Sequence, residues 1–345
     1  MTDRDQLIRE AVEAEAAQAV DSRDVLAALR RGRARRRPRA WVAVAAVATA
    51  AAAVAVVVPL AVSRSAAPTE PAAPPAESRT VLLVGVDDGT RTDAVVLARV
   101  AANGAVHAVS LPRDAWVDVP GGGKAKLNAV YATAHENATG DRVRAGAEAL
   151  TGVVGQLTGV HADHYAVVEM SALGRLVDAV GGVEVCLNAA VSDEFSGVDL
   201  PAGRHTLHGQ DAVAFMRQRR NLPEGDLSRV VRQQVVLRAL AGKYLSPDVL
   251  GDPARLAALV DVVTAQTRGD EGWDLLDFAR GMTPGAPVRA ATIPVGAAVS
   301  DPEAGFVLPV DPAAVRAFVS AFTSDTPAPG TPGTAPPPSG DGCVD

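Results

Sequence analysis

The amino-acid sequence predicts an α/β domain with a mixed central sheet sandwiched by helices, preceded by one transmembrane helix. Two observations lead to this prediction. Between residues 80 and 322, apolar runs of strand length alternate with segments whose apolar residues recur at helical spacing, a pattern typical of helices packed on a sheet. Residues 41–62, in contrast, contain no charged residue. The 345 residues therefore divide into a membrane-anchoring part and one folded domain.

The first predicted strand, residues 80–86, has the sequence TVLLVGV, whose continuous apolar character is typical of a strand covered on both faces. Further predicted strands are residues 93–100, 104–111, 165–168, 183–187 and 288–294. Predicted helices are residues 125–137, 145–157, 171–180, 253–267, 273–282 and 312–322. The glycine run 121–123 before Lys124 predicts a hairpin, because it lacks the spacing and the following hydroxyl residue of a P-loop. The pattern leaves the strand order open.

The apolar segment 41–62 consists almost entirely of Ala and Val. As a helix it reaches about 33 Å, enough to cross the roughly 30 Å hydrocarbon core of a bilayer. Residues 30–39, RRGRARRRPR, precede it, and the only basic residue within the dozen positions after it is Arg64. The positive-inside rule therefore predicts a single-pass protein of the cell membrane, with residues 1–40 in the cytoplasm and the rest outside. A cleaved signal peptide is the alternative, but its apolar region usually has about 7 to 15 residues.

The arginine run 30–39 could also indicate a nucleic-acid patch. It directly adjoins the apolar segment and has no aromatic residues interleaved, so topology accounts for it and we expect no nucleic-acid partner. Residues 1–40 hold ten Lys or Arg and seven Asp or Glu, which leaves 23 basic and 33 acidic residues for the rest of the chain. The expected extracellular part is therefore acidic, and a local cluster of arginines within it is informative.

Two segments that flank the predicted domain are too poor in large apolar residues to form a core. Residues 63–79 are rich in Pro and Ala and are expected to be a linker. Residues 323–345 are rich in Pro, Gly, Ser and Thr and are expected to be a disordered tail. Cys186 and Cys343 both lie in the part expected outside the membrane, where oxidation is permitted. They either form a disulfide that tethers the tail or remain two unpaired thiols.

Residues 215–234, FMRQRRNLPEGDLSRVVRQQ, concentrate five arginines in a short stretch. Arginine offers a fixed, charged fork that grips phosphate or carboxylate oxygens in pairs. If residues 216–219 are extended, Arg217 and Arg219 lie on one face, because strand side chains repeat every two residues. The pattern then predicts a clamp for an anion.

The second half of this stretch is predicted to be a helix that runs to about residue 245. Asp226 is its expected N-cap, and Arg229 and Gln233 then lie on one face at the i, i+4 spacing. The free amides of the first turn also favour an anion. The alternative is a salt-bridged surface helix without a ligand.

Carboxylates follow the first predicted strand directly. Asp87 ends that strand, and Arg91 and Asp93 come soon after it. Carboxylates at the carboxyl end of a buried strand lie where open α/β sheets bind ligands, and Asp87 and Asp93 could hold a hard divalent cation through oxygen. The alternative is a polar turn between two strands, for which DDGT is suitable chemistry.

Eight short motifs occur in order along the predicted domain, between residues 85 and 234. They are GVD, RTD, PRD, KLN, DHYAVVEM, VDAVGGVEV, LHGQDAVAFMRQR and DLSRVVRQQ. In this order, over roughly residues 80–244, they closely resemble the LytR-CpsA-Psr (LCP) family of bacterial cell-envelope phosphotransferases. The resemblance implies an LCP-like fold for the extracellular domain. The stretch between GVD and RTD is shorter here than in the family.

The resemblance also implies roles for individual residues. The residues implied to bind a pyrophosphate are Arg113, Lys126, Arg217, Arg219, Arg229 and Gln233. The implied cofactor is Mg²⁺, with Asp87 and Asp93 as its ligands. The implied catalytic residues are Arg91, Arg113 and Asp114. Asp114 is a candidate base for the attacking hydroxyl, and Asp93 is an alternative.

The implied reaction transfers a glycan from a polyprenyl pyrophosphate carrier to peptidoglycan, at the C6 hydroxyl of N-acetylmuramic acid, and releases polyprenyl phosphate. The implied partners are the lipid-linked glycan, the peptidoglycan acceptor and the membrane. The lipid tail would need a hydrophobic tunnel, which the Val-, Leu- and Ala-rich segments could line. Two alternatives remain open from the residues: a lipid pyrophosphate hydrolase and an envelope regulator without catalysis.

Overall fold

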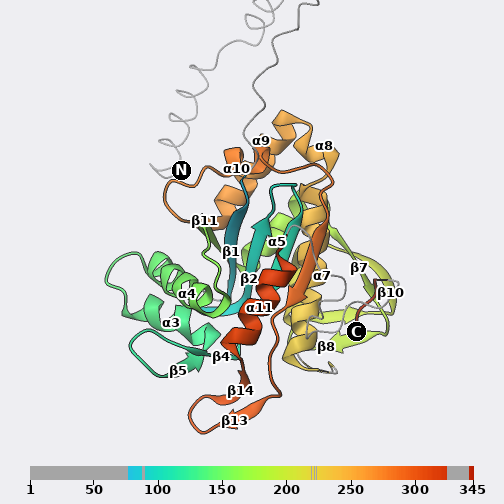
Figure 1. Ribbon diagram of the computed structural model, residues 1–345. Coiled ribbons are helices and arrows are strands. Elements are labelled where there is room, and N and C mark those ends of the chain that lie inside the picture. The colour runs from blue at the N-terminus through green and yellow to red at the C-terminus, as the bar shows by residue number, and fades with distance from the viewer. Residues whose placement is uncertain (1–76, 88–89, 219, 221, 223, 325–341) are drawn as a thin grey trace, which may run out of the picture. The chain divides into compact units, whose positions relative to one another are not determined.

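The computed structural model describes residues 77–87, 90–218, 220, 222, 224–324 and 342–345 (Figure 1). The predicted membrane span 41–62, the cytoplasmic segment 1–40 and most of the predicted linker 63–79 lie outside these residues. Within the described ranges, no helix combines the length and the apolar character that crossing a bilayer requires.

A six-stranded sheet forms the centre of the described fold. Its order is β11 (Thr267–Gly269), β6 (His164–Glu169), β1 (Arg79–Asp87), β2 (Arg91–Val100), β3 (Val106–Ser110) and β12 (Val288–Thr292). The β1–β6 and β3–β12 pairs are parallel, whereas β1–β2, β2–β3 and β6–β11 are antiparallel. The mixed α/β sheet predicted from the sequence is therefore confirmed. Strands from before and after residue 245 belong to this one sheet, so they share one core.

The helices agree with the predicted ranges to within a few residues, except that α6 and α8 were not predicted. Their bounds are α3 Leu127–Asn137, α4 Arg142–Thr158, α5 Met170–Ala179, α6 Gly209–Arg217, α7 Asp226–Tyr244, α8 Pro247–Leu250, α9 Pro253–Gln266, α10 Leu275–Arg280 and α11 Pro312–Phe322. In Figure 1, α11 lies in front of the sheet and α5 behind it.

The alternation of β1 assigns one set of side chains to each face of the sheet, as expected for a strand covered on both sides. Leu82, Val84 and Val86 join the core that α3, α4 and α11 cover. Val81 and Leu83 point to the opposite face, where α5 and α7 lie. The helices therefore sandwich the sheet, as predicted.

Smaller sheets complete the fold. One contains, in order, β13 (Val299–Asp301), β14 (Gly305–Pro309), β4 (Ala115–Asp118) and β5 (Lys124–Lys126). Two more are the pairs β10 (Gly203–Leu207) with β7 (Val183–Leu187) and β8 (Val191–Asp193) with β9 (Val198–Leu200). The predicted glycine hairpin is confirmed: β4 and β5 pair antiparallel, and the three glycines between them have φ values of 92°, 98° and 87°.

Two expectations from the sequence need correction. Residues 216–219 were expected to be extended, but Met216 and Arg217 end helix α6, because four of its apolar side chains recur at helical spacing and are buried.

The expectation of a disordered tail over 323–345 does not extend to residues 342–345. Val344 pairs with Leu187 of β7, and Cys343 forms a disulfide with Cys186 across a Cα–Cα distance of 4.4 Å. Of the two alternatives left open for the cysteines, the structure has the disulfide.

Candidate functional site

A β-bulge lies at Asp93 in the paired strands β1 and β2. Gly85 pairs with Ala94 and Val86 pairs with Thr92, so Asp93 is the extra residue of β2 between these two pairs. Bulges of this kind redirect a side chain out of the regular alternation and are common beside functional sites. Gly85 leaves room for the bulge, since a Cβ atom at this position would lie 3.2 Å from the Cβ of Ala94.

The redirected Asp93 carboxylate lies between two arginines. Nη1 of Arg113 donates to its Oδ1 at 2.8 Å, and Nη1 of Arg229 lies 3.4 Å from the same oxygen. Asp226 joins the group, because its Oδ1 lies 2.7 Å from Arg229 Nη2 and 3.4 Å from Arg113 Nε. The side chains of Asp93 and Arg229 are only 7% and 1% exposed. Charges buried in this way have to be paired, so these four residues form one connected ionic cluster.

Helix α7 delivers polar side chains into the protein interior over its first half. Every residue from Ser228 to Val236 is buried. Arg229 and Gln233 both contact Asp93, since Gln233 Nε2 donates to the Asp93 carbonyl at 3.3 Å. They lie on one face, as their spacing predicted. The helix begins one residue earlier than expected: Gly225, with φ 54°, is the N-cap, and Asp226 is the first helical residue. The Asp226 carboxylate pairs with Arg229 at the i, i+3 spacing.

Helix α6 brings Arg217 to the end of β1. Its first residue is fixed on α5, where Asp178 Oδ1 accepts from the Gly209 backbone N–H at 2.8 Å. The two helices approach closely, because a Cβ atom at Gly174 would lie 3.1 Å from the Gly209 carbonyl oxygen. At the other end of α6, Arg217 Nη2 donates to Oδ2 of Asp87. A residue 130 positions away in sequence therefore meets the first strand.

The turn between β3 and β4 supplies a second group of charges. Asp114 Oδ1 lies 3.0 Å from Lys126 Nζ, and its Oδ2 lies 3.6 Å from Arg113 Nε. The Arg113 carbonyl also accepts from the backbone N–H of Asn128 at 3.0 Å, which ties this turn to the start of α3. Arg113 therefore connects Asp114 and Lys126 with Asp93 and the α7 residues.

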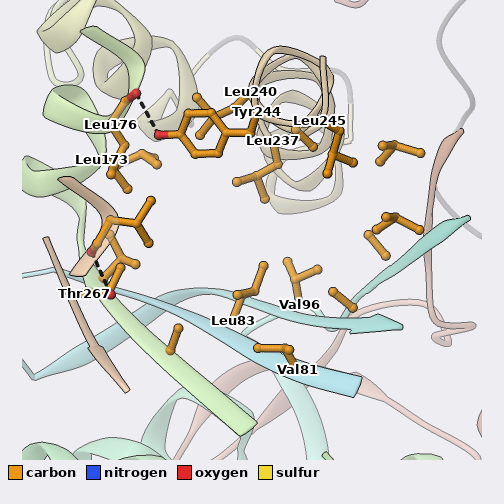
Figure 2. Close-up of a pocket in the computed structure, with 18 of the residues that line it drawn as sticks. Val81, Leu83, Val96, Leu173, Leu176, Leu237, Leu240, Tyr244, Leu245 and Thr267 are labelled. Carbon is orange, nitrogen blue, oxygen red and sulfur yellow. Dashed lines mark hydrogen bonds between the residues drawn. The ribbon is translucent and has the colours of Figure 1, made fainter. Parts of the chain in front are cut away.

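The ion-paired residues described above, including Asp87 and Arg217, are together called the charged cluster. An apolar cavity of about 360 Å³ adjoins it. It lies between the sheet and the helices α5, α7, α9 and α10. Figure 2 shows Val81, Leu83 and Val96 pointing into it from the sheet, and Leu237, Leu240 and Leu245 from the opposite side. Tyr244 also lines it, and its hydroxyl is bound to the Leu176 carbonyl at 3.0 Å. The lining is that of a site for a long apolar group.

Residues adjacent in sequence join the cavity to the charged cluster at three places. Ala94, Met216 and Gln234 line the cavity. Their neighbours Asp93 and Arg217 form ion pairs, and their neighbour Gln233 donates to the Asp93 carbonyl. Gln234 lies at the boundary between the apolar cavity and the polar residues. Its side-chain amide donates to the hydroxyls of Ser110 and Thr292 at 3.0 Å each. An amphiphile with an anionic head and an apolar tail fits this arrangement.

The structure brings together most of the residues that the sequence singled out. The predicted residues with contacts in the clusters above are Asp87, Asp93, Arg113, Asp114, Lys126, Arg217, Arg229 and Gln233. Arg91 lies opposite Asp87 in the β1–β2 register and has an exposed side chain. Arg219 is outside the described residues, so the predicted clamp between Arg217 and Arg219 stays a prediction.

Sequence reasoning missed the part that Asp226 and Gln234 play. Asp226 was assigned as a helix cap alone, although its i, i+3 spacing to Arg229 is that of an ion pair on one helix face. Gln234 interrupts the apolar lining of the cavity. A polar residue inside an otherwise apolar helical stripe is the signal that could have indicated it.

Two curated proteins are similar to this chain over much of its length. The cell wall biosynthesis protein LcpA of Corynebacterium glutamicum is 41% identical over 237 residues, which are 64% of this chain and 46% of that protein. The polyisoprenyl-teichoic acid–peptidoglycan teichoic acid transferase TagU of Enterococcus faecalis is 35% identical over 179 residues, 49% of this chain and 55% of that protein. The chain thus spans about half the length of these relatives.

A solved structure has the same fold. The LytR-Csp2A-Psr enzyme from Actinomyces oris superposes with a TM-score of 0.55 at 23% identity, over 72% of this chain and 90% of that one. The LytR_cpsA_psr family profile matches residues 55–302. This match includes the bulged strand pair, both clusters of charges and the cavity lining. The chain belongs to the LytR_cpsA_psr family.

Proposed function

We propose that this protein transfers a glycan from a polyprenyl pyrophosphate carrier to peptidoglycan and releases polyprenyl phosphate. The observation that carries the proposal is the junction between the charged cluster and the apolar cavity. A pyrophosphate with a prenyl chain on one side needs cations and an apolar channel next to each other. The names of the relatives, a cell wall biosynthesis protein and a teichoic acid transferase, support the same reaction class.

The cations act on the pyrophosphate. The proposed ligands of its oxygens are Arg113, Lys126, Arg217, Arg219, Arg229 and Gln233, of which Gln233 lies one turn beyond Arg229 on α7. In the described residues these cations are paired with carboxylates, which hold the side chains in place before a ligand binds. Cations fixed in advance stabilise charge that develops on a transferred phosphoryl group and its leaving group.

In the proposed step, an acceptor hydroxyl oxygen attacks the phosphorus next to the glycan. The bond from this phosphorus to the bridging oxygen breaks, and polyprenyl phosphate leaves with the electron pair. The hydroxyl proton passes to a carboxylate, for which we propose Asp114. Its position between Lys126 and Arg113, and its partial exposure, support this role because the acceptor has to approach from solvent. Arg91, exposed beside Asp87, is proposed to stabilise the same phosphate.

The carboxylates Asp87 and Asp93 fit a magnesium ion that the substrate shares. They lie at the adjoining ends of antiparallel strands, where Asp87 accepts from Arg217 and Asp93 Oδ1 contacts both Arg113 and Arg229. The described residues contain no group of three or more potential ligands. Magnesium in phosphoryl transfer commonly takes one or two carboxylates and completes its shell with phosphate oxygens and water. Bound there, it would neutralise charge on the pyrophosphate.

The proposed location follows from the sequence outside the described residues. With residues 41–62 spanning the membrane and residues 1–40 in the cytoplasm, the site is extracellular and near both the lipid carrier and peptidoglycan. A reporter that is active only outside the cell, fused after Asp345, should be active. Activity of a cytoplasmic reporter at that position would contradict this topology.

The reaction can be tested with the full chain in lipid nanodiscs. The donor is a synthetic polyprenyl-pyrophosphoryl glycan with ³²P in the phosphate next to the lipid, and the acceptor is a peptidoglycan glycan chain. We expect acceptor-bound glycan and labelled polyprenyl phosphate in equal amounts, loss of both with EDTA, and recovery with Mg²⁺. Asp114→Asn should lower the turnover number by about 100-fold.

The same assay separates the alternatives. A lipid pyrophosphate hydrolase would release polyprenyl phosphate without the acceptor and leave the glycan as a free phosphate. A regulator without catalysis would bind the donor and release nothing. Either result would overturn the proposed transferase activity.

A further inference from the structure

The segment formed by residues 342–345 lies against β7 as a short additional strand. Val344 donates to the Cys186 carbonyl at 2.9 Å, and its own carbonyl accepts from Asn188 N–H at 2.9 Å. The disulfide between Cys186 and Cys343 fixes it covalently across 157 residues of chain. Cys343 and Val344 are buried. This segment, which we call the tail strand, is therefore part of the folded domain.

Arg232 connects the tail strand to the loop that follows α6. Its Nε donates to the main-chain oxygen of Asp345 at 2.8 Å, and its Nη1 donates to Oε1 of Gln218. The guanidinium lies over the ring of Phe215, 4.6 Å from its centroid. Gln218 in turn donates to the Arg220 carbonyl at 3.0 Å. One guanidinium thus links the tail strand, α6 and the loop after it.

The burial of Arg232 requires an explanation beyond packing. Both Arg232 and Gln218 are 0% exposed. Burial lowers the pKa of Arg232 to about 10, although the charges of Asp345 and Asp193 oppose this shift. An apolar residue of similar volume often stabilises such a position as well or better. A guanidinium adds fixed directions for hydrogen bonds, and here it holds oxygens from two segments that are distant in sequence.

The residue directly before Gln218 is Arg217. Its side chain is 42% exposed and pairs with Asp87 across the solvent-facing end of β1. An exposed ion pair contributes little free energy on its own. The position of the Arg217 guanidinium therefore depends on how firmly the backbone at the end of α6 is held. Arg232 and Gln218 hold this backbone from the interior.

We propose that Arg232 is a positioning residue for Arg217, and that the tail strand, through Arg232 and Gln218, contributes to the grip on the substrate pyrophosphate. This inference rests on the proposed function for the ligand and on the contacts above for the coupling. The tail strand thus has a role in substrate binding through Arg217, which precedes it by more than a hundred residues.

The test compares binding of geranylgeranyl pyrophosphate and geranylgeraniol, which share a tail and differ in the head. The variants are Arg232→Met, Gln218→Leu and the double substitution Cys186→Ser/Cys343→Ser, all in the full chain. We expect each to weaken binding of the pyrophosphate by about fivefold or more and to change binding of the alcohol by less than about twofold. Arg316→Met is the control, since its exposed guanidinium donates to a carbonyl distant in sequence, that of Gln156, on the other side of the sheet.

Two further measurements separate positioning from general stability. In an Arg217→Ala background, Arg232→Met should have no additional effect on pyrophosphate binding, because the residue through which it acts is gone. Hydrogen exchange without ligand should be faster in the last turn of α6 in all three variants and unchanged in β1. Equal losses for both lipids, additive effects with Arg217→Ala, or unchanged exchange in α6 would each overturn the inference.

The outcome also distinguishes this inference from the proposed function. If the unaltered protein binds both lipids equally, the proposed function fails, and hydrogen exchange alone then decides whether the tail strand positions the end of α6. If the protein prefers the pyrophosphate and the variants keep that preference, the proposed function stands and the positioning role is wrong.

Discussion

Asp93 and Arg229 form an ion pair at 3.4 Å in which neither side chain is more than 7% exposed. The same carboxylate also accepts from Arg113 at 2.8 Å. An aspartate of a polar turn would be solvated on at least one side. Asp93 is instead a structural counter-ion, and substitutions that remove it act on the fold as well as on any ligand.

Asp93→Ala should lower the free energy of unfolding by about 3 kcal/mol, since it leaves buried guanidinium groups without this partner. Asp93→Asn keeps an acceptor oxygen and should cost less. Urea unfolding followed by circular dichroism measures both. The control is Asp118→Ala, which breaks an exposed pair with Lys124 at 3.0 Å and should cost less than about 1 kcal/mol. Equal losses at Asp93 and Asp118 would contradict the buried pairing.

Arg217→Lys should weaken binding of geranylgeranyl pyrophosphate by about 1 to 3 kcal/mol, because lysine keeps the charge and loses the two-pronged donor. Arg220→Lys is the comparison. Arg220 stacks on Phe195, with its guanidinium carbon 3.4 Å from the ring centroid, and should tolerate the change. Isothermal titration calorimetry gives both affinities. If affinity falls in Arg220→Lys and not in Arg217→Lys, the pyrophosphate binds near Arg220, and the proposed site is wrong.

Ala98→Phe should block the apolar cavity, because Ala98 lines it from β2. We expect weaker binding of geranylgeranyl pyrophosphate and unchanged binding of dimethylallyl pyrophosphate, whose tail is short. The matched control is Ala314→Phe on the exposed side of α11. Competition between the two ligands against a fluorescent prenyl probe measures the difference. If both ligands lose affinity equally, the tail does not enter the cavity at this position.

Tyr131 should make the protein sensitive to alkaline pH. Its side chain is 0% exposed, and burial, assisted by the charge of Asp141, raises its pKa from 10.0 to about 12. The folded state keeps the phenol proton that the unfolded state loses above pH 10. The stability present below pH 10 should therefore fall as the pH rises toward 12, by an amount on the order of 2 kcal/mol.

Tyr131→Phe removes the titrating group and should abolish this part of the decline. Among the described residues, the Tyr131 hydroxyl has no hydrogen-bond partner, so the substitution should not destabilise the protein at pH 7. Urea unfolding of both proteins at pH 9 and pH 11.5 provides the comparison. An identical decline in the two would assign the alkaline transition to other groups.

The sequence predicted the layers of this fold better than its connections. Residues 80–86 were recognised as a strand because they form a continuous apolar run of strand length. Residues 183–187 and 312–322 were also assigned to the correct kind of element. The end of α6 was assigned to a strand. Its arginines and glutamine obscured a helical stripe whose burial depends on α5, a partner that local pattern does not indicate.

In the candidate site, too, contacts within one element were predictable from the sequence and contacts between elements were not. Spacing predicted that Arg229 and Gln233 share a face, since both lie on one helix. It did not indicate that Asp93 leaves the regular alternation of β2, because a bulge is set by the pairing with β1. The meeting of Arg217 with Asp87 depends on how α6 docks on α5, and no pattern within either segment contains that information.

The apolar cavity has a consequence for the state in which the protein exists. Its walls are strands on one side and helices on the other, so α7 and the sheet do not close on each other along this stretch. Elsewhere in the domain, side chains fill the equivalent space between sheet and helix. A ligand that occupies the cavity favours the folded chain over the unfolded one by mass action. If the cavity holds the lipid tail of the proposed substrate, that tail completes the hydrophobic core from outside the polypeptide.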